Sequence, residues 1–359
     1  MALRAGAVED VAVEPGFWKG KRVLVTGHTG FKGSWLCMWL HGMGADVTGY
    51  SISVPTEPSL FELARVEDGV RSLTGDVRDR EALGRAFDEG RPEIAIHMAA
   101  QSLVRRSYRN PAETYETNVL GTVNLLEVVR ARGDVRAVVN VTTDKVYENL
   151  EEERSFREDE PKGGHDPYSN SKACSELVTV AYSASFFGLG ATAVAAARAG
   201  NVIGGGDWGE DRLIPDLMHG VLTDSATLIR NPEAVRPWQH VLNPLSGYLM
   251  LTERMWDSDD FSEAWNFGPA ERDAQSVRAV IARLSELWGE EIPWEQDPGD
   301  HPHEAHSLRL DSSKAAERLG WVPAWDLDRA LVSIADWYRG YREGADPRDL
   351  VGAQIQEFG

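Results

Sequence analysis

Two neighbouring residues of opposite charge stand where a buried strand is expected to end. The stretch NVTTDKVYE, residues 140–148, opens with β-branched residues typical of a strand and then places Asp144 next to Lys145. An acid and a base that follow the hydroxyl of Thr143 are side-chain types that move protons. A structural ion pair is the alternative, because neighbours on a regular strand point to opposite faces. The sequence therefore predicts an acid–base site at residues 143–145.

A second candidate pair is Tyr168 and Lys172, in the stretch DPYSNSKA. On a predicted helix the two residues lie one turn apart, so the ammonium faces the same ligand as the phenol and favours its ionised form. A phenolate can act as a base. The pattern favours a catalytic pair over an exposed helical face.

Glycines are spaced G-x-x-G-x-x-G in the stretch TGHTGFKG, at Gly27, Gly30 and Gly33. They stand between a predicted strand at 21–27 and a predicted helix at 31–44. Backbone amides and a helix N-terminus in such a turn suit a pyrophosphate. The turn therefore predicts dinucleotide binding, with further contacts expected from Thr29, Phe31 and Lys32.

The acid that usually follows about 20 residues later, to hold the adenosine ribose, is missing. The second predicted strand ends with Tyr50 and Ser51 instead. No arginine follows at once to favour a 2′-phosphate, so NAD is expected rather than NADP. Asp76 is a predicted adenine contact, with a helix N-cap as the alternative. Further predicted cofactor contacts are Val77, Ala99 and Ala100.

Short apolar strands alternate with helical patterns up to about residue 200, which indicates a doubly wound parallel sheet of Rossmann type, an α/β fold. Beyond that point the chain becomes rich in Gly, Pro, Trp and Asp. We predict an NAD-binding domain at 17–200, with a returning segment around 237–268. A smaller, loop-rich substrate domain is expected at 201–236 and 269–345, over the carboxyl edge of the sheet.

Composition narrows the class of protein. The 359 residues are 42% hydrophobic, enough for a sizeable core, and their formal net charge of −20 disfavours nucleic acid as a partner. No run of eighteen apolar residues predicts a membrane span, and the first residues do not resemble a secretory signal, so a cytoplasmic protein is expected.

Metal and disulfide chemistry are not expected. Cys37 and Cys174 are far apart and read as small buried hydrophobes. The stretch DHPHEAH contains His301, His303 and His306, but a flexible acidic loop without cysteine lacks the fixed geometry of a zinc site.

Four stretches, TGHTGFKG, HMAAQSLVRRSY, VTTDKVY and YSNSK, together resemble the extended short-chain dehydrogenase/reductases that act on nucleotide sugars. The resemblance covers about residues 17–343 and includes PTEPSLF, RAGNVIGGGDWGEDRLIPD, RPWQHVLNPLSGYL and WNFGP. Lysine in the third place of Thr-Asp-Lys is similar to the branch of the nucleotide-sugar 4,6-dehydratases that acts on CDP-glucose.

The resemblance implies a mechanism. Tyr168 as phenolate takes the proton of the sugar 4-hydroxyl while the C4 hydride passes to NAD⁺, and Thr143 hydrogen-bonds the same oxygen. Asp144 then acts as the acid at the C6 hydroxyl, which requires desolvation to raise its pKa. Lys145 acts as the C5 base, which requires a lowered pKa, or remains charged and polarises the ketone. The hydride finally returns to C6.

A CDP-sugar carries a pyrophosphate, so an acidic protein must supply basic groups locally. Arg105 and Arg106 are placed to reach either cofactor or sugar. The other predicted substrate-binding residues are Asn201, Arg212, Arg230, Arg236, Gln239 and Arg309, of which Asn201 resembles a residue that contacts the substrate phosphates. The resemblance also implies a homodimer or homotetramer that pairs through helices near 113–131 and 168–187.

Three other functions stay open. The chain could dehydrate another nucleotide sugar, epimerise a sugar at C4, or sense NAD(H) without turnover. The Asp144–Lys145 pair favours dehydration, because an epimerase expels no water. The presence of Tyr168 and Lys172 speaks against a sensor.

Overall fold

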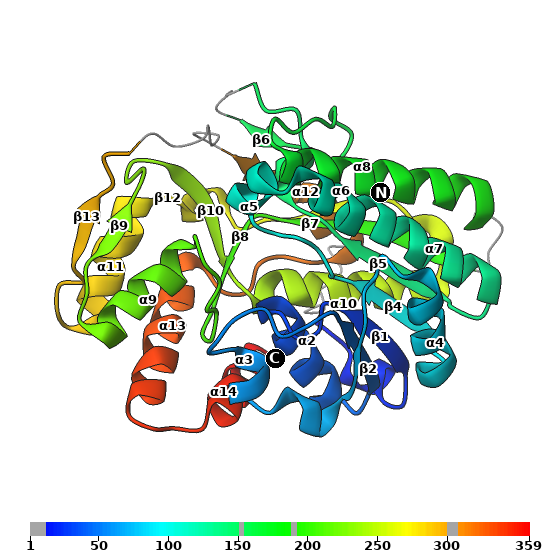
Figure 1. Cartoon of the computed structure of the whole chain (residues 1–359), viewed down its shortest axis with the longest axis horizontal. Coiled ribbons are helices and arrows are strands. Elements are labelled where there is room, and N and C mark those ends of the chain that lie inside the picture. The colour runs from blue at the N-terminus through cyan, green and yellow to red at the C-terminus, as the bar shows by residue number, and fades with distance from the viewer. Residues whose placement is uncertain (1–11, 151–153, 188–191, 300–307) are drawn as a thin grey trace, which may run out of the picture.

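A seven-stranded parallel sheet forms the centre of the molecule (Figure 1). The computed structural model describes residues 12–150, 154–187, 192–299 and 308–359. The strand order is β11-β7-β5-β4-β1-β2-β3. In chain order the strands are β1 (Arg22–Thr26), β2 (Asp46–Ser51), β3 (Arg71–Thr74), β4 (Ile94–His97), β5 (Ala137–Val141), β7 (Ala193–Ala199) and β11 (Ala264–Phe267).

The central strands are apolar on both faces because helices cover both sides of the sheet. Every residue of β4, β5 and β7 is buried. The strand order reverses between β1 and β4, where Thr26 is in register with both Tyr50 and His97. Ligands of such sheets bind at the carboxyl ends of the strands beside this reversal. The predicted doubly wound fold is confirmed.

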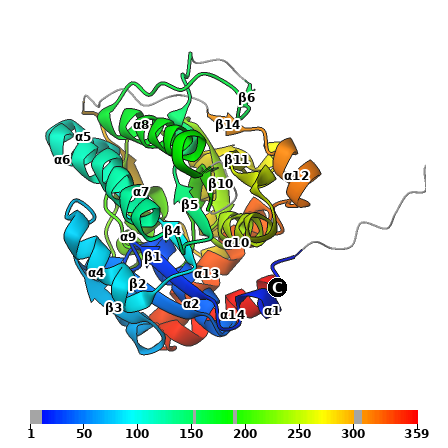
Figure 2. The same cartoon turned by 90° about the vertical axis from the view of Figure 1, so that its right-hand side faces the viewer.

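Helices lie in one layer on each face of the sheet (Figure 2). One layer holds α4 (Arg80–Gly90), α7 (Gly121–Arg132) and α8 (Pro167–Tyr182), and the other holds α2 (Phe31–Gly42) and α10 (Leu242–Asp257). The two layers build separate apolar clusters, one around Leu24, Ala95 and Val138, the other around Val23 and Ile96. Shorter helices of this part are α1 (Pro15–Trp18), α3 (Leu60–Leu63), α5 (Val104–Arg109) and α6 (Pro111–Tyr115).

Small sheets and further helices lie outside the central sheet, most of them on the left of Figure 1 and β6 at its top. One sheet combines β8 (Asn201–Ile203), β10 (Val235–His240) and β12 (Ala274–Ser276), and another pairs β9 (Thr227–Ile229) with β13 (Trp294–Gln296). A third pairs β6 (Ser155–Phe156) with β14 (Arg309–Leu310). The helices of this part are α9 (Leu213–Thr223), α11 (Val277–Trp288), α12 (Ser313–Leu319) and α13 (Leu327–Arg342).

The last helix returns to the part of the molecule that contains β1 and α2. Helix α14 (Pro347–Phe358) contacts α2, and the rings of Phe358 and Trp39 lie edge to face with centroids 5.6 Å apart. Strand β11 also returns, alongside β7. The division into two domains at the residues given above remains a prediction. The sequence analysis did not predict helix α14, which lies beyond the last predicted domain boundary at residue 345.

The structure also bears on the expectations about metal sites and membrane-spanning helices. In the described part of the chain no three His, Cys, Asp or Glu side chains gather as a metal site would need. His301, His303 and His306 lie outside the described residues. Within the described ranges, the helices are too short or too polar to cross a bilayer.

Candidate active site

The glycine turn between β1 and α2 is packed too closely for side chains. Gly27 has φ +75°, and a Cβ on it would lie 2.8 Å from the amide nitrogen of Ala99. A Cβ on Gly33 would lie 2.2 Å from the carbonyl oxygen of Gly27. Gly30 stands at the N-terminus of α2, which has no side-chain cap. Its amides are therefore available to an anionic ligand, as the motif predicts.

A neutral hydrogen-bonded chain occupies the place of the missing ribose-binding acid. The Ser51 hydroxyl accepts from the Thr29 amide at 3.3 Å and contacts Nδ1 of His28 at 2.8 Å. His28 Nε2 contacts the Ser72 hydroxyl at 2.8 Å. Burial lowers the pKa of His28 to about 4, so the imidazole is neutral at physiological pH. The end of β2 thus offers a hydroxyl where related turns offer a carboxylate.

The alternative helix-cap role of Asp76 is wrong. Asp79, not Asp76, caps α4 by accepting from the Ala82 amide. Asp76 accepts from the backbone amide of Arg78 at 2.9 Å, and its ion pair with that guanidinium is 2.6 Å long. Although burial opposes the change, these bonds from Arg78 lower the pKa of Asp76. The other predicted cofactor contacts have small or buried side chains. Val77 is buried, and Ala99 and Ala100 follow β4 beside the glycine turn.

Residues 142–147, called the β5 turn below, carry the acid and the base. The strand ends at Val141, and Asp144–Val146 form a single 3₁₀ turn. Because this is a turn, the rule that strand neighbours point to opposite faces does not separate Asp144 from Lys145. Lys145 is half-buried and its charge acts on Asp144. The structural objection to an acid–base pair is thereby removed.

Asp144 has one oxygen satisfied and one free. Oδ1 accepts from the Thr143 hydroxyl at 2.9 Å, whereas Oδ2 is buried and unpartnered among the described residues. A Cβ on Gly200 would lie 3.0 Å from Oδ2, so the glycine keeps this close contact away from the free oxygen. Burial raises the pKa of Asp144, against the opposing effects of Lys145, Thr143 and Arg236. A carboxyl whose pKa is raised and which has a free oxygen is suited to the role of an acid.

Helix α8 delivers the phenol and the amine to the same place. Asp166 caps the helix by accepting from the Ser169 amide, and Pro167 occupies its first turn. Burial raises the pKa of Tyr168 to about 12, opposed by an interaction with the Thr143 side chain. Tyr168 therefore lies at the β5 turn, although residues 143 and 168 are far apart in the sequence.

The environment of Lys172 differs from the predicted one. Its ammonium donates to the Val141 carbonyl at 2.9 Å, and among the described residues it forms no hydrogen bond with the phenol of Tyr168. Burial lowers the pKa of Lys172 to about 8, while Glu176 opposes the change. The amine lies at the end of β5 beside the candidate acid, but in the protein alone it does not ionise the phenol.

Lys32 reaches into this site from the glycine turn. Its ammonium donates to the Tyr248 hydroxyl at 2.9 Å and lies over that ring. Burial, together with the charges of Lys172 and Arg212, lowers the pKa of Lys32 to about 7, although Asp144 opposes this. Sequence reasoning missed Tyr248 on α10, because a tyrosine inside an apolar helix carries no spacing signal.

Three predicted substrate arginines converge on the loop between β8 and α9. Arg105 forms an ion pair with Asp211 at 2.9 Å, and Arg212 forms one with Asp207 at 3.0 Å. The Arg230 guanidinium donates to the Asp211 carbonyl at 3.5 Å. The two aspartates were not predicted. Arg106 instead pairs with Glu113 of α6 at 2.8 Å.

Of the remaining predicted substrate residues, three lie on the neighbouring strands β8 and β10, and Arg309 lies apart from them on β14. Arg236 is buried on β10, and its charge acts on Asp144. Gln239 donates to the Phe267 carbonyl at 2.8 Å, and Asn201 pairs with Trp238 at the start of β8. Arg309, on β14, forms an ion pair with Glu271 at 3.3 Å, away from the β5 turn.

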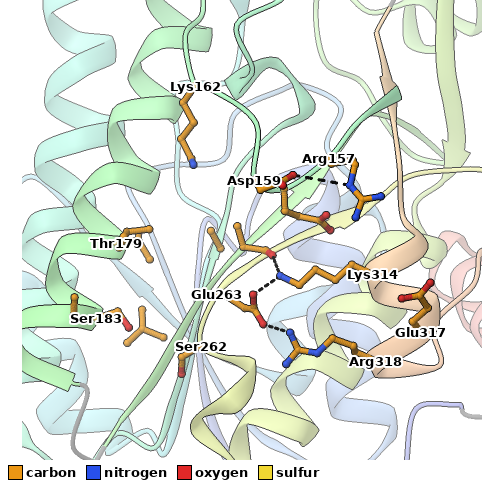
Figure 3. Close-up of a pocket in the computed structure, with 16 residues that line it drawn as sticks. Arg157, Asp159, Lys162, Thr179, Ser183, Ser262, Glu263, Lys314, Glu317 and Arg318 are labelled. Atoms are coloured by element: carbon orange, nitrogen blue, oxygen red, sulfur yellow. Dashed lines mark hydrogen bonds and ion pairs between the residues drawn. The ribbon is translucent and has the colours of Figure 1, made fainter. Parts of the chain in front are cut away.

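A cavity of about 610 Å³ lies away from the β5 turn, against the C-terminal half of α8 and strands β7 and β11 (Figure 3). Its lining includes Lys162, Glu263 and Lys314 but none of the catalytic residues predicted above. Lys314 pairs with Glu263 at 2.5 Å, and Arg318 pairs with the same carboxylate. The candidate active site is therefore not this cavity.

Comparison with known proteins places these features in context. Residues 24–333 match the family described as GDP-mannose 4,6 dehydratase. A CDP-glucose 4,6-dehydratase from Salmonella typhimurium is 52% identical over 355 residues, which cover 96% of this chain and 98% of that protein. A dTDP-glucose 4,6-dehydratase from Mycobacterium tuberculosis is 30% identical and covers 94% of this chain and 99% of its own length.

Solved structures agree with the fold. DesIV, a dTDP-glucose 4,6-dehydratase from Streptomyces venezuelae solved with NAD, superposes with a TM-score of 0.76 at 27% identity, over 91% of this chain and 100% of its own. A UDP-glucose 4-epimerase from Thermotoga maritima, solved with UDP-glucose, gives 0.78 at 25% identity, over 89% and 99%.

Proposed function

The chain belongs to the GDP-mannose 4,6-dehydratase family, and on that premise we propose that it converts CDP-D-glucose to CDP-4-keto-6-deoxy-D-glucose with NAD as cofactor. The identity of 52% with a CDP-glucose 4,6-dehydratase supports this substrate over other nucleotide sugars. One observation carries the reaction type. Asp144 is a buried carboxyl with a raised pKa and an unpartnered oxygen, and it lies beside Thr143 and Tyr168.

The glycine turn fits the pyrophosphate of NAD. Gly27 and Gly33 exclude side chains from the turn, and α2 begins without a cap. Lys32 adds a cation to the turn. When bound, NAD supplies a hydride acceptor and donor, and its positive nicotinamide ring favours the Tyr168 phenolate. Because Ser51 replaces the usual acid, the ribose is expected to be held less tightly.

We assign the first proton transfer to Tyr168. Its phenolate would take the proton of the sugar 4-hydroxyl as the C4 hydride leaves to bound NAD, and the Thr143 hydroxyl hydrogen-bonds the same oxygen. Lys172 holds positive charge at the end of β5, where negative charge develops on the sugar oxygen. The product of this step is a 4-ketone.

The second half of the reaction removes water. The ketone acidifies the C5 hydrogen, the neutral amine of Lys145 takes that proton, and Asp144 gives its own proton to the departing C6 hydroxyl, which leaves as water. Return of the C4-derived hydride from bound NAD to C6 and of a proton to C5 would then give the 4-keto-6-deoxy sugar. Burial raises the pKa of Asp144, which favours the protonated carboxyl that this step needs. In a variant of this scheme Lys145 remains charged and stabilises the enolate.

We assign the substrate pyrophosphate to the arginines that surround the loop between β8 and α9. Arg105, Arg212 and Arg230 each contact Asp207 or Asp211 of that loop or its backbone. Guanidinium groups retain further N–H donors when one carboxylate is bound, and these suit phosphate oxygens. Arg236, Gln239 and Asn201 are proposed to contact the sugar side, and Arg309 to contribute from β14.

The substrate is tested by incubating the purified protein and NAD with CDP-, dTDP-, UDP- and GDP-glucose and with GDP-mannose. We expect loss of one water by mass spectrometry, fastest with the CDP-sugar. Loss of water from another nucleotide sugar alone would move the assignment within the family. A change of C4 configuration without loss of mass would identify an epimerase, and cofactor binding without any product would favour a sensor.

We propose a homodimer or homotetramer that forms through the outer faces of α6–α8. Large hydrophobic side chains are exposed on these helices and on the segments next to them, namely Tyr108, Tyr115, Leu120, Leu177, Val180 and Phe186. Exposed apolar side chains that gather on one face mark an interface in soluble proteins. Light scattering should give a multiple of 39.7 kDa, and Leu177→Asp with Val180→Asp should reduce it to one chain. A cytoplasmic address is proposed with the activity.

A further inference from the structure

A fully buried ion pair lies directly behind the β5 turn. Glu176 on α8 and Arg198 on β7 are both 0% exposed. The guanidinium meets the carboxylate with two nitrogens, Nε at 2.8 Å from Oε1 and Nη2 at 2.6 Å from Oε2. Neither residue is among the groups assigned above to cofactor or substrate.

Burial of such a pair needs a reason. Charges removed from water lose solvation, and apolar residues of similar volume often serve stability as well or better. A buried pair of this kind is therefore weak evidence for stability. Its contacts show what else it does.

The carboxylate holds the first residue of the β5 turn. The Thr142 hydroxyl donates to Glu176 Oε1 at 2.6 Å. Thr142 immediately precedes Thr143, the residue that hydrogen-bonds Asp144.

The guanidinium holds the last residue of the same turn. Arg198 Nη1 donates to the Tyr147 hydroxyl at 2.5 Å, and its guanidinium carbon lies 4.8 Å from the centre of that ring. The Tyr147 hydroxyl donates onward to Asn266 Oδ1 at 2.7 Å, which ties the turn to β11. One ion pair thus fastens both ends of a six-residue turn.

From these contacts we propose that Glu176 and Arg198 are positioning residues, which fix the β5 turn so that Thr143, Asp144 and Lys145 meet the substrate in register. The proposal rests on the dehydratase activity proposed above. Misplacement of a reacting group by about 1 Å can cost about 100-fold in rate, so a fixed turn has value for catalysis.

The same carboxylate acts on Lys172. Glu176 follows Lys172 by one helical turn, and its charge opposes the burial that lowers the pKa of the amine. The charged groups around Glu176 are Arg198 on β7, Lys172 on its own helix, and Lys162, whose ammonium is 4.0 Å away and also lines the cavity of Figure 3. Glu158 is near the pair through its carbonyl, which accepts from Arg198 at 3.4 Å.

The test cuts each attachment without removing a charge. In Thr142→Val and Tyr147→Phe one hydroxyl is lost from each end of the turn, and the double variant loses both. We expect the double variant to lower kcat by about tenfold or more, with KM within about threefold, because only the orientation of the reacting groups changes. Thr142→Ser restores the hydroxyl and should restore kcat.

A matched control removes a buried threonine hydroxyl at the opposite end of the sheet. Thr192 is buried and donates to the Val135 carbonyl at 2.7 Å, far along the strands from the β5 turn. Thr192→Val should leave kcat within about twofold of the parent. If the double variant also stays within about twofold, the positioning role is refuted. A parent enzyme that dehydrates no sugar refutes the proposed function instead, before any variant is compared.

The charge itself gives a second readout. Glu176→Gln removes the negative charge that supports protonated Lys172, so the alkaline limb of the kcat–pH profile should move to lower pH. An unchanged limb in a folded variant contradicts the electrostatic part of the proposal. Should this variant fail to fold, the hydroxyl variants still decide the positioning role.

Discussion

The two sides of the β5 turn treat buried polar groups in opposite ways. On the side that faces the glycine turn, Asp144 has an unpartnered oxygen, and burial shifts the pKa values of Tyr168, Lys172 and Lys32 away from their ordinary ranges. On the side that faces β7, Glu176 and Arg198 satisfy each other and their neighbours through several hydrogen bonds.

The difference shows where function is located. Native proteins pair nearly all buried polar groups with hydrogen-bond partners. The unpaired oxygen of Asp144, two residues from the fully paired Thr142, therefore suggests a place where a ligand supplies the partner. The satisfied side supplies rigidity and the unsatisfied side supplies reactivity. The comparison predicts that substitutions on the first side change activity more than stability, and that those on the second side do the reverse unless they also disturb the turn.

The largest effect is expected for Tyr168→Phe. Loss of the phenol removes the first proton acceptor, so kcat should fall by about 10⁴-fold, while NAD still binds through the glycine turn. Steady-state kinetics and cofactor titration measure both quantities, and thermal unfolding should change little. Retention of turnover would refute the role of Tyr168. A protein that only senses cofactor would keep its binding behaviour and would have no turnover to lose.

On the satisfied side, Arg198→Met should act first on stability. The substitution leaves Glu176 buried without its cation, which costs about 3–5 kcal/mol of unfolding free energy. The double variant Glu176→Gln with Arg198→Met should recover much of this loss, because neither charge then remains. Chemical denaturation compares the three proteins. Equal losses in the single and double variants would show that packing, and not unpaired charge, dominates.

Asp144→Asn and Lys145→Met should separate two steps on the unsatisfied side. Lys145→Met should keep C4 oxidation and slow exchange of the C5 hydrogen with solvent deuterium by about tenfold or more, because the base is gone. Asp144→Asn should keep that exchange and slow loss of water. Product mass and deuterium content in D₂O report both. Unchanged exchange in Lys145→Met would leave Lys145 only the polarising role.

The smallest effect is a pH-dependent one at Lys32. Its pKa in the folded protein, about 7, lies below the ordinary lysine value of 10.5, so folding disfavours the ammonium. The penalty is complete below about pH 7 and disappears as the pH rises towards 10.5. Lys32→Met should therefore stabilise the ligand-free protein by about 1 kcal/mol at pH 6.5 and by less at pH 9.5.

The exposed Lys19 offers the control for Lys32. Lys19→Met makes the same substitution at an exposed side chain, and its change in unfolding free energy at each pH is the reference for Lys32→Met. A pH-independent effect of Lys32→Met would show that its ammonium is solvated in the folded protein.

Much of the fold and part of the candidate site could be predicted from local sequence patterns. Strands that are apolar at every position, separated by helical patterns, predicted a parallel doubly wound sheet. In such a sheet helices cover both faces of each strand. The spacing of Gly27, Gly30 and Gly33 predicted the turn, since steric exclusion of a side chain is a local property. Tyr168 and Lys172 were found because a helix places residues four apart on one side.

Tertiary structure alone decided the environments. Whether Asp144 keeps its proton depends on burial against Gly200, and whether Lys172 touches the phenol depends on the Val141 carbonyl, which lies on another element. Tyr248, Asp211 and Arg198 enter from distant segments and carry no spacing signal. Periodicity fixes which residues face inwards, whereas desolvation and charge at a given atom depend on every neighbour that the folded chain brings there.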